Sequence, residues 1–175
     1  MPPLDDQPMQ GVEVSETGLG KFQAKVRTPG GEFTVDEPVE VGGLGTGPNP
    51  YDLLSAALGA CTTMTIRLYA ERKGWPVDSI IVRVAHHRDA PDGKDRFARE
   101  IVVEGKLTPD QRRRLVEIAE HCPVHQTLER GSDVITVLAE HALSSGLGPD
   151  PGPDFLEHAR DMTAACDKAD AAAGG

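Results

Sequence analysis

Residues 49–61 read NPYDLLSAALGAC, and they predict the start of one long helix. Asn49 is a good helix N-cap, Pro50 suits the first helical position, and Asp52 can close a capping box. No residue between Asp52 and Arg67 is charged. A helix that is apolar on nearly every side is buried on nearly every side. We therefore expect this helix to lie at the centre of the fold.

The length of this helix bears on the assembly of the protein. Gly74, followed by Pro76, is the expected end of the helix, which gives it a length of roughly 35 Å at the usual rise per residue. One small sheet covers only one side of such a helix. We therefore predict a homodimer in which a second copy of the chain covers the uncharged span Leu53–Ile66.

The flanking sequence alternates short strands with helices and predicts an α+β fold. Thr108 and Gln111 form a capping box that opens a second helix, and Pro123 should break that helix because proline lacks the amide donor. Period-two alternation predicts antiparallel strands. The expected strands are Phe22–Arg27 with Glu32–Val35, Ser79–His87 with Phe97–Leu107, and a last strand at Val134–Leu138.

Composition and charge indicate one globular domain with acidic ends. The chain has 175 residues and a net charge of -10, most of it near the two termini. We expect a flexible acidic segment at 1–19, one domain at 20–142, and a Pro/Gly linker with a weakly helical acidic tail at 143–175. The nearly neutral centre has no basic stripe, so nucleic-acid binding is not expected.

The N-terminus has neither the basic start nor the apolar run of a signal peptide. We expect no stretch to approach the ~20 apolar residues of a membrane span. These observations predict a cytoplasmic protein that does not bind membranes.

Three cysteines in a reducing compartment argue against a structural disulfide framework. Cys61 lies in the predicted buried helix, where a free cysteine often acts as a small hydrophobic residue. Cys122 precedes Pro123 and is a candidate N-cap of a short helix, whose dipole would stabilise a thiolate. Cys166 lies in the tail, and no role is expected for it.

A metal site is an alternative interpretation of the second cysteine. His121 and His125 flank Cys122, and Cys61 could supply a fourth ligand. Structural zinc sites usually draw two ligand pairs from separate elements, which this spacing does not offer. We therefore predict no metal.

The two cysteine motifs together resemble a known family. The stretch 49–61, ending in Ala-Cys, and His121–Leu128, which reads HCPVHQTL, resemble the OsmC/Ohr family of osmotically inducible and organic hydroperoxide resistance proteins. The resemblance covers roughly residues 20–140. Tyr-Asp after Asn-Pro and Cys-Pro-Val-His around the second cysteine look like the OsmC-like branch.

The resemblance implies a function for both cysteines. Cys61 matches the peroxidatic cysteine, whose thiolate attacks the peroxide and becomes a sulfenic acid. Cys122 matches the resolving cysteine, which condenses with it to a disulfide that an external thiol or dithiol reduces. No cofactor is implied. The family fold is an intertwined dimer, with antiparallel sheets around the central cysteine-bearing helix and the site at the subunit interface.

The chain departs from the family pattern at the groups that activate the thiol. The family peroxidases carry a Glu directly after Asn-Pro, paired with an Arg from the N-terminal strands. Tyr51 stands at the Glu position here, and Asp52 is one residue away. Arg27 is the best candidate for the missing cation, and His125 is a further supporting residue.

The predicted function is thiol-dependent reduction of hydroperoxides in oxidative-stress defence. An organic hydroperoxide is the expected substrate, because the predicted interface pocket is lined by Leu, Ala and Met. Two alternatives stay open: a non-catalytic module that binds a small hydrophobic ligand or senses redox state, and a metal-binding domain.

Overall fold

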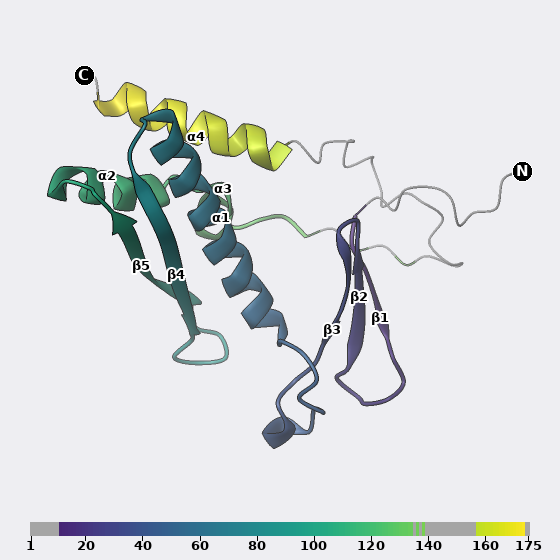
Figure 1. The fold of residues 1–175 in the computed structure, drawn as a ribbon. Helices are drawn as coiled ribbons and strands as arrows, with labels where there is room; N and C mark the ends of the chain where they lie inside the picture. Colours follow the sequence, from purple (N-terminus) through teal and green to yellow (C-terminus); the bar gives the residue numbers. More distant parts are fainter. Residues whose placement is uncertain (1–10, 135, 137, 139–156, 174–175) are drawn as a thin grey trace, which may run out of the picture. The chain divides into compact units, whose positions relative to one another are not determined.

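The structure is a computed structural model that describes residues 11–134, 136, 138 and 157–173. The chain divides into two compact units, of which the first contains the residues up to Leu53. The second contains Leu54–Val134 together with Phe155–Gly175. Figure 1 shows the elements of both units.

The first unit contains a three-stranded antiparallel sheet. Its strands are β1 (Glu13–Glu16), β2 (Ala24–Thr28) and β3 (Gly31–Val35), in the spatial order β1-β2-β3. The β2–β3 hairpin was predicted, whereas β1 lies in the segment expected to be flexible. Its side chains are all exposed, so no apolar alternation marked it as a strand. A short 3-10 helix, Val39–Val41, and an irregular loop connect the sheet to the long helix.

The second unit is built on a β-hairpin and on the long helix α1 (Pro50–Arg72), whose first four residues belong to the first unit. The side chain of Asn49 accepts hydrogen bonds from the amides of Tyr51 and Asp52, and Asp52 accepts one from the amide of Asn49. The predicted capping box is therefore present. At the other end Gly74 adopts a left-handed conformation, with φ of 64°, as a helix stop requires.

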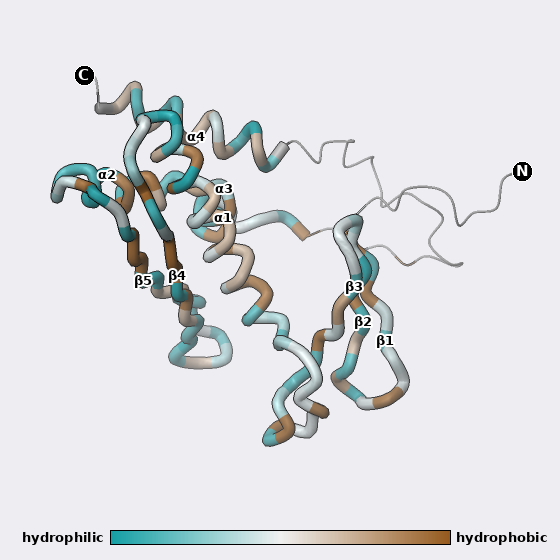
Figure 2. Tube along the Cα trace, viewed as in Figure 1, coloured by the Kyte–Doolittle hydropathy of each residue, from teal (hydrophilic) through white to brown (hydrophobic). Residues whose placement is uncertain are grey.

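The hairpin of β4 (Val77–His87) and β5 (Arg96–Gly105) is antiparallel, as predicted. Exposed and partly buried side chains alternate along both strands. Ile80 and Val84 of β4, with Ile101 and Val103 of β5, pack against the helices. Figure 2 shows the resulting hydrophobic stretches along the two strands.

Two short helices follow the hairpin. The first, α2 (Pro109–Ala119), begins with the predicted capping box of Thr108 and Gln111. The second, α3 (Pro123–Arg130), begins at the predicted break, with Cys122 as its N-cap. The last predicted strand, Val134–Leu138, includes residues 135 and 137, which lie outside the described residues.

The core of the second unit includes the C-terminal helix α4 (Glu157–Ala173). Cys166 and Ala169 of this helix are buried in one cluster with side chains of α1, α2 and β4. Cys166, for which the sequence indicated no role, fills part of the core with its thiol. Burial raises the pKa of this thiol. Figure 1 shows α4 crossing α1.

Among the described residues, α1 is the one helix that is long and apolar enough to cross a membrane. This differs from the expectation that no stretch approaches such a length. Core helices share the property, and 44% of the apolar window is buried inside the chain. Leu58, Cys61 and Ile66 are buried, whereas Leu54 and Met64 remain exposed.

Candidate active site around a cysteine pair

The structure brings Cys61 and Cys122 together in the second unit. Their Sγ atoms lie 3.0 Å apart, although 61 positions separate them in the chain. Both side chains are buried, with relative exposures of 1% and 0%, and both thiols are free. A disulfide requires about 2.05 Å between the sulfurs, so an approach of roughly 1 Å would join them. The arrangement is that of a reduced dithiol.

The first turn of α3 directs backbone amides at both sulfurs. The amide of Val124 donates to Cys61 Sγ at 3.4 Å, and the amide of His125 donates to Cys122 Sγ at 3.5 Å. These amides are free to do so because the first turn of a helix has no carbonyl partners for them. With the helix dipole they stabilise negative charge on sulfur.

A buried arginine that was not among the predicted site residues lies near Cys122. The side chain of Arg99 in β5 is only 8% exposed. Its guanidinium donates to Thr62 Oγ1 at 2.9 Å and to the carbonyl of Ala119 at 3.0 Å. Thr62 Oγ1 in turn lies 3.8 Å from Cys122 Sγ. The positive charge of Arg99 therefore acts on Cys122.

The predicted supporting residue His125 belongs to the same network. Arg99 Nη2 lies 2.9 Å from His125 Nδ1 and 3.0 Å from a carboxylate oxygen of Glu120. Because arginine can only donate, Nδ1 accepts this hydrogen bond and Nε2 carries the ring proton. His125 Nε2 faces the carboxylates of Glu120 and Glu129, each at 3.5 Å. His125 thus orients Arg99. Within the described residues, its imidazole ring forms no hydrogen bond to either sulfur.

The hydrogen bond between the sulfurs separates their pKa values. It is the largest of the effects that lower the pKa of the Cys122 thiol to about 6, and the amide of His125, Thr62 and Arg99 add to it against the cost of burial. The same bond and burial raise the pKa of the Cys61 thiol. The pair therefore holds one negative charge and one proton at neutral pH.

A further histidine reaches the pair from the C-terminal helix. His158 Nε2 lies 3.2 Å from Cys61 Sγ, on the side of the sulfur that α4 covers. This residue lies in the segment that the sequence predicts to be a weakly helical acidic tail. Its position on α4 brings it to the site from 97 residues further along the chain.

The other predicted supporting residues lie in the first unit. Arg27 in β2 forms ion pairs with Glu13 at 3.5 Å and with Glu32 at 2.9 Å. Asp52 serves in the N-terminal capping box of α1, and Tyr51 is partly exposed in the same turn. A part for these residues at the cysteine pair stays a prediction.

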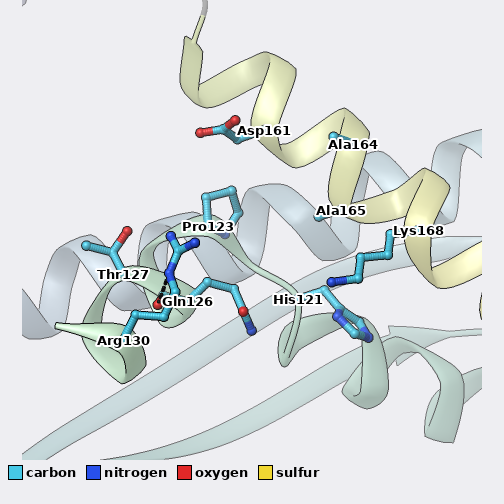
Figure 3. A pocket seen from close by; sticks show the side chains of 9 residues that line it. All are labelled: His121, Pro123, Gln126, Thr127, Arg130, Asp161, Ala164, Ala165 and Lys168. Atoms are coloured by element: carbon cyan, nitrogen blue, oxygen red, sulfur yellow. Dashed lines mark hydrogen bonds between the residues drawn. The ribbon is translucent and has the colours of Figure 1, made fainter. Parts of the chain in front are cut away.

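A hollow of about 320 Å³ lies between α3 and α4. Figure 3 shows His121, Pro123 and Gln126 on one side of it and Ala164, Ala165 and Lys168 of α4 on the other. Its lining is largely polar, so it is not the apolar interface pocket that the sequence predicted. Within the described ranges, no group of three or more His, Cys, Asp or Glu side chains is arranged to hold a metal ion.

Comparisons with known proteins identify the fold and the family of the chain. The sequence model of the OsmC-like protein family matches residues 43–137. No curated protein matches the chain in sequence. The α+β fold, with two small antiparallel sheets and a long central helix, is the fold of several solved OsmC/Ohr structures.

Three of these structures show the extent of the likeness. A Psychrobacter arcticus protein assigned to the osmotic stress and detoxification response has a TM-score of 0.59 and 21% identity, covering 69% of this chain and 89% of its own. The Mycoplasma pneumoniae OsmC-like protein has a TM-score of 0.57 and 18% identity, and the match covers 71% of this chain and 89% of that protein. The Legionella pneumophila organic hydroperoxide resistance protein OsmC has a TM-score of 0.54 and 24% identity, and the match covers 67% of this chain and 87% of that protein.

The chain belongs to the OsmC-like protein family, because the family match spans more than half of it. At sequence identities of 18% to 24%, the likeness to the solved structures shows the fold alone. The Legionella protein is described as an organic hydroperoxide resistance protein.

Proposed function

We propose that this protein reduces organic hydroperoxides with Cys61 as the attacking thiol and Cys122 as the resolving thiol. The observation that carries the proposal is the distance of 3.0 Å between the two buried sulfurs. The family association with hydroperoxide resistance supports the choice of substrate.

The reaction consumes two thiols for each peroxide. The Cys61 thiolate attacks one peroxide oxygen, the O–O bond breaks, and the alkoxide that leaves takes up a proton to become an alcohol. Cys122 then attacks the sulfur of the Cys61 sulfenic acid. Hydroxide leaves and takes up a proton from the solvent, which yields a disulfide and water. An external dithiol restores both thiols by disulfide exchange.

The electrostatics of the site suit this sequence of steps. The amides of Val124 and His125 supply hydrogen bonds to whichever sulfur carries the charge. The low pKa of Cys122, about 6, keeps it ionised for the second step.

Serine variants and one equivalent of an alkyl hydroperoxide test the assignment of the two roles. Wild type should consume the peroxide and form a disulfide. Cys122→Ser should consume it and stop at a sulfenic acid on Cys61, which a dimedone adduct identifies by peptide mass spectrometry. Cys61→Ser should be inert, and Cys166→Ala, which keeps an apolar side chain in the core, should behave as wild type.

Two results would contradict the proposal. If Cys61→Ser consumed peroxide at the wild-type rate and carried the sulfenic acid on Cys122, the two roles would be reversed. If wild type did not consume peroxide at all, a module that binds a hydrophobic ligand would be the better interpretation.

A further inference from the structure

The imidazole of His158 is placed to exchange a proton with Cys61. Its Nε2 lies 3.2 Å from Cys61 Sγ. The other polar groups beside this sulfur, within the part of the chain that the structure describes, are Cys122 Sγ, the amide of Val124 and the hydroxyl of Thr65, which is too weak an acid to exchange a proton as imidazole does. An amide does not give up its proton, whereas imidazole both accepts and donates one near neutral pH.

The position of His158 is fixed by the way α4 docks. Cys166 and Ala169 are buried against α1 and α2. Asp167 pairs with Arg72, and Asp170 pairs with Lys73 at 2.8 Å and with the Tyr69 hydroxyl at 2.9 Å. These contacts fix both the rotation and the register of the helix.

The spacing along α4 explains why this docking brings a histidine to the site. His158, Met162 and Cys166 are separated by four residues each, so they share one face of the helix. Each of these side chains is partly or fully buried, whereas Ala159, Arg160 and Asp161 are exposed. His158 is therefore part of the face that packs on the second unit.

Different groups surround the two sulfurs. Arg99 and Thr62 act on Cys122, and they help to ionise it. The Cys61 thiol keeps its proton more firmly, because of its bond to Cys122 and its burial. An attack by Cys61 therefore requires a group that removes this proton at the moment of reaction.

We infer that His158 is a catalytic residue that takes the Cys61 proton and delivers it to the leaving alkoxide. The inference rests on the proposed function. Nε2 of His158 accepts the thiol proton as the sulfur attacks the hydroperoxide. The O–O electron pair leaves with the alkoxide, which takes the proton from Nε2 to become the alcohol. Thiol and hydroperoxide are thus converted to sulfenic acid and alcohol, and His158 ends neutral.

This role would belong to a helix beyond the matched family region. The family match ends at residue 137, whereas α4 begins at Glu157. The C-terminal helix would then supply the proton-transfer group in a chain that has Tyr51 where the family peroxidases carry a Glu.

Chemical rescue of His158→Ala by imidazole is the test. The variant leaves space beside Cys61 for a free imidazole molecule. The rate at which one equivalent of alkyl hydroperoxide is reduced should fall by about a hundredfold, which is the scale of general acid–base catalysis, and added imidazole should restore part of it. His87→Ala, which changes an exposed histidine of β4, should keep the wild-type rate with and without imidazole.

Other outcomes would overturn the inference. An unchanged rate in both His158→Ala and His158→Gln would remove His158 from the reaction. A fall that imidazole does not restore would assign the residue to packing.

Alkylation of Cys61 separates this inference from the proposed function. Iodoacetamide also reacts with the thiolate, so its reaction with Cys61 should show the same loss and rescue without any peroxide. Wild type that is inert to peroxide but shows this pattern would contradict the proposed function alone. Peroxide reduction with no dependence on His158 would contradict the inference alone.

Discussion

Arg99 shows how one buried charge acts on the cysteine pair. A guanidinium that is 8% exposed has lost most of its hydration, and four acceptors compensate for that loss: Thr62, the carbonyl of Ala119, Glu120 and His125. Arginine remains charged under these conditions, whereas lysine can lose its proton. The charge therefore persists beside Cys122 and favours its thiolate.

The pH dependence of thiol alkylation tests this effect. A pKa of about 6 means that Cys122 is ionised above that pH and protonated below it, so the alkylation rate of Cys122 in wild type should rise through about pH 6. In Arg99→Met the lost charge should raise this pKa and move the midpoint to higher pH. Arg99→Lys, which keeps the charge, should stay closer to wild type. A midpoint unchanged in Arg99→Met would show that Arg99 serves packing alone.

The sequence contains a signal for two site residues that were not predicted, Arg99 and His158. Arg99 stands in phase with Phe97, Ile101 and Val103 on the inward face of an alternating strand. His158 stands on the apolar face of a helical repeat. A charged or titratable residue on an apolar face calls for a partner in the core. The identity of that partner depends on tertiary contacts, which a single sequence does not contain.

At the scale of elements, local chemistry made several predictions that the structure confirms. The capping boxes at Asn49 and Thr108 and the break at Pro123 all depend on residues within one turn. The strand β1 could not be predicted in this way, because its four side chains are exposed and it forms by pairing with β2. The docking of α4 also depends on distant partners.

A matched pair of charge substitutions tests the docking of α4. Ala169→Asp places a carboxylate at a position that is 1% exposed, and an unpaired buried charge costs several kcal/mol, so α4 should detach. Ala171→Asp, two residues along the helix, is exposed and should have no effect. The reaction of Cys166 and Cys61 with an aromatic disulfide reagent should accelerate in the first variant only. Equal protection in both variants would contradict the docked position of α4.

At the scale of the whole molecule, α1 is covered on one side within the chain. Leu58, Cys61 and Ile66 are buried, whereas Ala60 and Met64 on the other side are exposed. An exposed apolar face on a long central helix is the feature from which the sequence predicted a homodimer. The dimer stays a prediction, since a single chain is described.

Light scattering after size-exclusion chromatography tests the predicted dimer. Wild type should elute as a dimer at micromolar concentration, and Ala60→Arg should shift it to monomer, because a guanidinium would have to be buried in the interface. Val116→Arg is the control, because Val116 is an exposed apolar residue that belongs to α2 and not to α1. A wild-type monomer, or a dimer that Ala60→Arg leaves intact, would contradict the prediction.

The cysteine pair is the claim on which the proposed chemistry depends, and a map of the disulfide tests it most directly. Reduced wild-type protein is treated with one equivalent of an alkyl hydroperoxide, blocked with iodoacetamide, digested without reductant and analysed by mass spectrometry. The predicted result is one peptide pair joined through Cys61 and Cys122, with Cys166 alkylated or still reduced. Recovery of both Cys61 and Cys122 as alkylated thiols after the peroxide treatment, or of a disulfide that includes Cys166, would contradict it.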